Sequence, residues 1–220
     1  MTRIVMAGAS GAIGRLVLAR LLARADVTAV HVIGRRALSL NHERLHQHVM
    51  PLEALDAFQP DFQVDAACNC LGTTIKAAGS EAAFRAVDQD AVLAFARLAQ
   101  RAGARRFVSV SAIGASPHAA TFYSRVKGEV EASLSGMGFS ALDLLQPSLL
   151  LGDRDEFRAG ERAAQLLSVP FGPLMRGPLS PWRPIETRVV AMAAVASLCR
   201  DLPGLRRHAW TSLQALAARA

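Results

Sequence analysis

The sequence predicts an α/β protein built on a doubly wound parallel sheet. Short runs of apolar and β-branched residues alternate along the chain with segments whose apolar residues recur at helical spacing. Right-handed crossovers between such strands place helices on both faces of one parallel sheet. A chain of 220 residues can bury one such core, so we expect a single domain over residues 1–220.

The expected elements follow from local pattern and from the residues that end each run. The expected strands are residues 1–7, 27–33, 47–50, 65–71, 106–111 and 142–150, with a short strand at 207–210. The expected helices are residues 14–24, 80–102, 122–135 and 187–200, followed by a terminal helix. Residues 152–184 are rich in proline and lack periodicity. We therefore expect a core over 1–151 and a small, irregular substrate-side region over 152–220, with a short helix at 161–167.

The composition excludes several classes of function. The net charge is +7, but the arginines are scattered and aromatic residues make up only 5% of the chain, which argues against a primary role in nucleic-acid binding. No apolar run approaches the ~18 residues of a membrane span. Cys68, Cys70 and Cys199 are too few and too scattered for a disulfide framework. We expect a cytoplasmic protein that binds no nucleic acid and no membrane, as a monomer or homodimer.

A glycine-rich turn joins the first expected strand to the first expected helix. Its spacing, G-x-x-G-x-x-G, suits Gly8 to a tight turn, Gly11 to close approach of a pyrophosphate, and Gly14 to helix–strand packing. The helix N-terminus then offers free N–H groups to the phosphates. The turn predicts a dinucleotide site, whose expected residues here are Gly8, Ser10, Gly11, Ala12, Ile13 and Gly14.

Two arginines at the end of the second strand indicate which dinucleotide binds. An acidic residue at this place would bind the ribose 2′-OH of NAD, whereas arginine accommodates the 2′-phosphate of NADP. The chain has Arg35 and Arg36 here, and the next acid is Glu43. A guanidinium binds two phosphate oxygens at once. We therefore expect NADP, with NADPH preferred over NADH.

A tyrosine and a lysine form the candidate catalytic pair. Tyr123 is the single tyrosine of the chain, and Lys127 is one of two lysines. At positions i and i+4 they project from one face of the expected helix. Ser111 lies twelve residues earlier, at the carboxyl end of a strand, where doubly wound sheets bind ligands. Ser111 and Tyr123 are placed to converge on one carbonyl oxygen, and Tyr123 and Lys127 can bracket one bound group.

Together these features resemble the short-chain dehydrogenase/reductase superfamily, which has a Rossmann fold, and its extended and atypical branches in particular. Further segments resemble the Tat-interacting-protein-like group of atypical oxidoreductases. They are CLGTT (70–74), VDQD (87–90), VKGEVE (126–131), QPS (146–148) and LLGDR (150–154). The resemblance covers roughly residues 3–200. One position departs from it, because Asp88 stands where related extended enzymes commonly carry asparagine.

The resemblance implies a role for each matching residue. Tyr123 would be the general acid/base, and Ser111 would orient and polarise the carbonyl. Lys127 would bind the nicotinamide ribose and, by its charge, favour ionisation of the tyrosine. The residues implied beside the cofactor are Leu71, Gly72 and Thr73 after the fourth strand and Pro147 and Ser148 near the nicotinamide.

Three other groups are weighed against simpler explanations. His42, His46 and His48 lack a Cys or carboxylate at ligand spacing, so we expect exposed polar residues before a strand and no metal. Cys68 and Cys70 share one face of a strand and are expected to fill apolar space. The charged residues at 153–156 are either a substrate contact or a solvated loop.

The sequence thus predicts an NADP-dependent oxidoreductase acting on a small carbonyl or alcohol substrate. One alternative is a nucleotide-sugar epimerase or dehydratase, which normally needs a larger C-terminal domain than the ~70 residues after the sixth strand. Another is a non-catalytic NADP-binding regulator. The substrate, the direction of reaction and the role of residues 152–184 are left open by the sequence.

Overall fold

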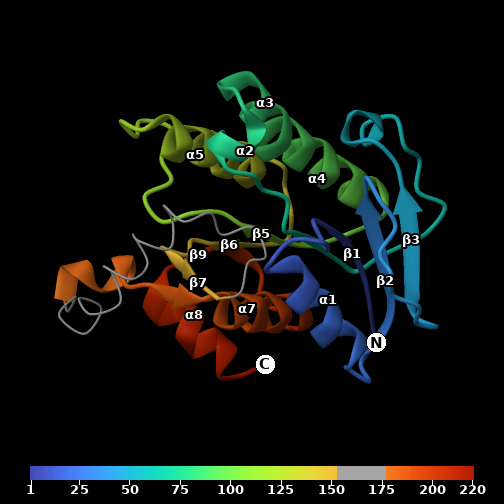
Figure 1. Cartoon of the computed structure of the whole chain (residues 1–220). Helices are drawn as coiled ribbons and strands as arrows, with labels where there is room; N and C mark the ends of the chain where they lie inside the picture. Colours follow the sequence, from blue (N-terminus) through green and yellow to red (C-terminus); the bar gives the residue numbers. More distant parts are fainter. Residues whose placement is uncertain (153–176) are drawn as a thin grey trace.

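The protein forms a parallel sheet of seven strands with helices on both faces, as predicted (Figure 1). The computed structural model describes residues 1–152 and 177–220. The order across the main sheet is β3-β2-β1-β4-β5-β6-β9, and every pairing is parallel. Its strands are β1 (Thr2–Ala7), β2 (Val27–Gly34), β3 (Leu45–Val49), β4 (Ala66–Asn69), β5 (Arg106–Val110), β6 (Ala141–Leu145) and β9 (Gly204–His208). Because the chain builds outward from β1 and then returns to β4 on its other side, the topological switch point lies between these two strands.

Two layers of helices cover the sheet, one on each face (Figure 1). The first consists of α1 (Gly14–Leu22), α7 (Thr187–Cys199) and α8 (Trp210–Ala217). The second contains α4 (Ala91–Arg101) and α5 (Phe122–Ser135), with the short helices α2 (Ile75–Ala78) and α3 (Glu81–Arg85) at one end. Short 3₁₀ helices occur at Leu52–Ala54 and Gly177–Trp182. Each layer buries an apolar cluster against its face of the sheet, which is why the strands are apolar on both sides.

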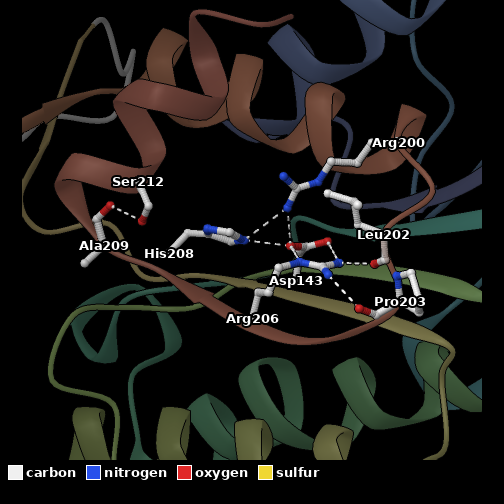
Figure 2. A network of polar contacts seen from close by, with 8 residues as sticks. All are labelled: Asp143, Arg200, Leu202, Pro203, Arg206, His208, Ala209 and Ser212. Carbon is white, nitrogen blue, oxygen red and sulfur yellow. Dashed lines mark hydrogen bonds and ion pairs between the residues drawn. The ribbon is translucent and has the colours of Figure 1, made fainter.

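The edge strand β9 is held to β6 by buried charge (Figure 2). Asp143 on β6 accepts hydrogen bonds from Arg206 at 2.9 and 3.1 Å and from Arg200 at 2.8 Å, and lies 2.6 Å from the His208 ring nitrogen. Burial opposes ionisation of Asp143, yet the hydrogen bonds with His208 and Arg206 and the charge of Arg200 hold its pKa well below the usual range. The polar residues Arg206 and His208 of β9 can therefore lie in the sheet, because both contact Asp143 of β6.

The structure differs from the expected elements in three places. The sixth strand ends at Leu145 because Pro147 has no N–H to donate, and β7 (Leu150–Leu151) instead pairs with β8 (Ile185–Glu186) in a second sheet. The long helix expected at 80–102 is interrupted by a π-helical turn, Ala86–Asp90. The short helix α2 was not expected at all, although Thr74 caps it by accepting a hydrogen bond from Ala77 N–H.

The core also extends beyond residue 151, where we expected it to end. β9 completes the sheet, and buried residues of α7 pack in the same apolar cluster as α1. The expected helix at 161–167 and the charged residues at 153–156 lie outside the described residues. Within the described ranges, no helix combines the length and apolarity needed to cross a bilayer.

Candidate functional site

A cleft open to solvent lies at the carboxyl ends of β1, β2 and β4. Its walls are the glycine turn that follows β1, the residues around Gly34 that end β2, and the segment 70–72 that follows β4. This is the switch point of the sheet, where open α/β folds bind ligands. The structure therefore brings together three of the segments that the sequence predicts for cofactor binding.

Gly8 shapes the floor of this cleft. Its φ is +80°, a backbone region that strongly favours glycine. A Cβ at this position would lie 2.3 Å from the carbonyl carbon and oxygen of Cys70 on the neighbouring strand end. The turn after β1 and the segment after β4 thus approach at backbone distance, and the cradle so formed fits a phosphate group at the start of α1.

Arg35 and Arg36 line the same cleft and are both exposed. Among the described residues, neither guanidinium is held by a hydrogen bond or ion pair. Most other arginines around the sheet have partners, as Arg44 does with three backbone carbonyls. Two unengaged guanidinium groups at the end of β2 fit an anionic group at the adenosine end of a dinucleotide.

Lys127 lies behind the cleft in an ion pair. Its Nζ is 2.7 Å from Asp88 Oδ1, with the two side chains 7% and 0% exposed. The other oxygen of Asp88 accepts the Thr73 N–H at 2.7 Å. A Cβ on Gly72 would lie 3.6 Å from Asp88 and 4.0 Å from Lys127. The pair therefore lies next to the cleft wall at Gly72.

Ser111 is buried and hydrogen-bonded to a carboxylate. Its Oγ donates to Glu131 Oε1 at 2.6 Å. Gln146 Nε2 donates to both oxygens of Glu131 at 2.9 and 3.1 Å, and Arg207 Nε donates at 3.0 Å. A serine hydroxyl has one proton, so in this arrangement only its lone pairs are left for a ligand. The expected role of Ser111 in polarising a carbonyl requires its hydroxyl to rotate away from Glu131.

Tyr123 lies on α5 one turn before Lys127 and is half-buried. Its ring packs against Phe84 with 5.7 Å between ring centres. Gly128 allows the loop before α5 to pack closely against the helix, because a Cβ at this position would lie 2.0 Å from the backbone of Ser116. Glycine at this position lets the loop that follows Ser111 lie directly on the helix that carries Tyr123 and Lys127.

Pro147 and Ser148 lie at the carboxyl end of the sheet next to β5. The Pro147 carbonyl accepts the Ile113 N–H at 2.9 Å, and the Ser148 hydroxyl donates to the Arg183 carbonyl. Neither residue lines the cleft, and neither do Ser111, Tyr123 and Lys127. The structure thus separates the predicted residues into a dinucleotide cleft and a polar group next to it.

The expectation for the histidines is wrong in part. His46 and His48 lie within β3, and His48 packs beside the buried His31 of β2, with 3.1 Å between the two ring nitrogens. Phe62 stacks on His31 at 3.9 Å between ring centres. No group of three or more metal ligands occurs in the described part of the chain.

The expectation for the cysteines agrees with their geometry. The sulfurs of Cys68 and Cys70 are 3.7 Å apart on one face. Hydrogen bonding to Cys70 and burial raise the pKa of the Cys68 thiol well above its ordinary value, so it stays protonated.

The sequence analysis did not identify Glu131 as the partner of Ser111, nor Asp88 as the partner of Lys127. The signal for Glu131 was present, because Tyr123, Lys127 and Glu131 recur at four-residue spacing on one face of α5. An acid on that face must be paired once the face is buried. The partners Ser111 and Gln146 come from different strand ends, and no local pattern predicts them.

The chain is similar to a known protein family and to several curated proteins. Residues 8–146 match the model of the NAD(P)H-binding family. The protein HTATIP2 of Rattus norvegicus is 39% identical over 166 residues, which cover 74% of this chain and 68% of that protein. The mitochondrial protein fmp52-1 of Aspergillus terreus is 32% identical over 212 residues, 93% of this chain and 90% of that one.

Solved structures share the fold. WbmH of Bordetella bronchiseptica, solved in complex with NAD⁺, superposes with a TM-score of 0.69 and 16% identity over 95% of this chain and 76% of that one. A UDP-N-acetylglucosamine 4-epimerase from Methanobrevibacter ruminantium M1 gives a TM-score of 0.68 and 15% identity over 94% and 76% of the chains. At these identities the likeness establishes the Rossmann architecture alone.

Proposed function

The chain belongs to the NAD(P)H-binding family, in the atypical short-chain dehydrogenase/reductase group, and from that premise we propose that it is an NADP-dependent oxidoreductase. Its substrate is a small carbonyl compound or the corresponding alcohol. The observation that carries the proposal is the cleft whose glycine floor and two unengaged arginines lie in front of the Lys127–Asp88 pair. The fungal relatives bear mitochondrial names, so a cytoplasmic location stays a prediction.

The residues of this chain divide the work. The turn at Gly8 and the start of α1 hold the pyrophosphate, and Arg35 and Arg36 hold the 2′-phosphate. Lys127 binds the ribose beside Gly72. The nicotinamide supplies or accepts hydride when the cofactor is bound. Tyr123 exchanges the proton of the substrate oxygen.

Cofactor titration tests the proposal. NADPH and NADH binding are measured by fluorescence for the wild type, Arg35→Ala and Gly8→Ala, with Arg20→Ala as the control because Arg20 is an exposed arginine on α1 outside the cleft. We expect Arg35→Ala to weaken NADPH roughly tenfold and to leave NADH unchanged, since a charge-assisted hydrogen bond is lost. Gly8→Ala weakens both. Equal affinity of the wild type for the two cofactors, with no effect of Arg35→Ala, contradicts the NADP assignment.

A second candidate function is non-catalytic NADP binding. The observation that favours it is that Ser111 and Lys127 are both engaged by buried carboxylates. Turnover of NADPH on a broad panel of aldehydes and ketones, lost in Tyr123→Phe, supports the oxidoreductase. Binding that survives Tyr123→Phe, with no turnover by the intact protein, supports the regulator.

A further inference from the structure

Asp88 combines a buried ion pair with a rare backbone conformation. The carboxylate is fully buried, and a buried ion pair is often less stable than apolar side chains of the same volume. The surrounding backbone is a π-helical turn inside an otherwise α-helical segment. Such turns are rare and frequently mark functional sites. A buried ion pair and a π-helical turn at one residue, next to the cofactor cleft, point to a role beyond packing.

Asp88 joins the cleft wall to the catalytic helix. One oxygen binds the Thr73 N–H, so it fixes the segment that follows β4. The other binds Lys127, so it fixes the ammonium group on α5. The residues that Asp88 connects are 54 positions apart in the chain, and its own helix supplies the bridge between them.

The same helix also faces the tyrosine. Phe84 lies one turn before Asp88 and packs on Tyr123, while Asp88 pairs with Lys127 one turn after Tyr123. The two segments therefore meet in two successive contacts, one at Tyr123 and the next, one turn later, at Lys127. The neighbouring charges Arg85 and Glu129 are bound to each other at 2.5 Å. Of these two ion pairs, the Lys127–Asp88 pair is therefore the one that a substitution of Asp88 alters.

We propose that Asp88 is a positioning residue that holds Lys127 at the cofactor cleft and cancels the charge that Lys127 presents to Tyr123. The proposal deepens the function above, since it rests on Tyr123 as the acid–base group. An asparagine at this position keeps the hydrogen-bond acceptor for Thr73 and removes the negative charge. It leaves the ammonium uncompensated and makes ionisation of the tyrosine easier.

The lone tyrosine makes this directly measurable without substrate or cofactor. Biosynthetic fluorotyrosine labels Tyr123 alone, because it is the single tyrosine of the chain, and the phenol of fluorotyrosine ionises at lower pH than that of tyrosine. Fluorine NMR then gives the midpoint of ionisation in each variant. The variants are Asp88→Asn, Lys127→Met and the double substitution. Asp90→Asn is the matched control, because it removes the same charge from an exposed residue of the same turn.

We expect Asp88→Asn to move the midpoint roughly one pH unit lower, and Lys127→Met to move it to higher pH by a similar amount. The double substitution returns it close to wild type, and Asp90→Asn leaves it unchanged. The same Asp88→Asn protein is expected to bind NADPH several-fold more weakly, because Lys127 loses its anchor.

A midpoint that is the same in Asp88→Asn and Asp90→Asn overturns the proposal, as does one that rises in Asp88→Asn. These outcomes are separate from failure of the proposed function. If the wild type binds no NADPH while the midpoints shift as expected, the oxidoreductase assignment fails and the role of Asp88 in setting the charge at Tyr123 stands.

Discussion

The buried histidine at the β2–β3 edge gives a stability prediction whose size follows from the structure. His31 is 8% exposed, stacked between Phe62 and the β3 histidines. Burial first, and then the neighbouring His46 and His48, lower its pKa from 6.5 to about 4, against a smaller opposite effect of Asp61. The pKa of His48 is lowered for the same reason, chiefly by burial.

The sign follows from comparing the two states. As pH falls, the unfolded chain takes up a proton at His31 near pH 6.5, while the folded protein does so only near pH 4. Protonation therefore stabilises the unfolded state first, and stability is lost between these two values and levels off below pH 4. From about pH 7.5 to about pH 5, His31 alone costs about 2 kcal/mol of unfolding free energy.

Urea unfolding at these two pH values, followed by tryptophan fluorescence, measures the loss. Carboxylates titrate in the same range, so the variant His31→Phe provides the reference, because a phenyl ring keeps the stacking on Phe62 and cannot be protonated. We expect the wild type to lose about 2 kcal/mol more than the variant between the two pH values. An equal loss in both proteins would refute the reasoning that His31 is held neutral by burial.

Two further predictions concern the helix that carries the candidate catalytic pair. Gly128→Ala is expected to lower the unfolding free energy by about 1–3 kcal/mol, because the added Cβ would lie 2.0 Å from the Ser116 backbone. Thermal unfolding measures this cost. Gly136→Ala is the control, since its nearest atom would be 3.5 Å away, and an equal or smaller cost for Gly128→Ala would contradict the prediction. Lys127→Met is expected to cost about 3–5 kcal/mol by leaving Asp88 buried and unpaired. Adding Asp88→Asn should recover part of that cost in urea unfolding, and strictly additive losses would show that the two side chains are not coupled.

The sequence by itself determined the fold class, the position of the phosphate-binding turn and the helix at Phe122–Ser135. Each of these depends on short-range chemistry. Apolar periodicity records which face an element buries, and Gly8 records a backbone angle and a close approach. The capping serine at position 80 was likewise readable, since its hydroxyl accepts the Ala83 N–H as the local pattern predicts. These signals lie within a few residues of one another in the chain.

Only the tertiary structure decided which groups the candidate catalytic residues contact. Ser111 binds Glu131 and Lys127 binds Asp88, each across a separation of 20 residues or more. A π-helical turn, which no apolar period signals, brings Asp88 to that position. The distances between elements, and hence the partners of a buried charge, are fixed by how helices pack on the sheet. The sequence therefore identifies the candidate site residues, and the packing of helices on the sheet decides which charged groups contact them.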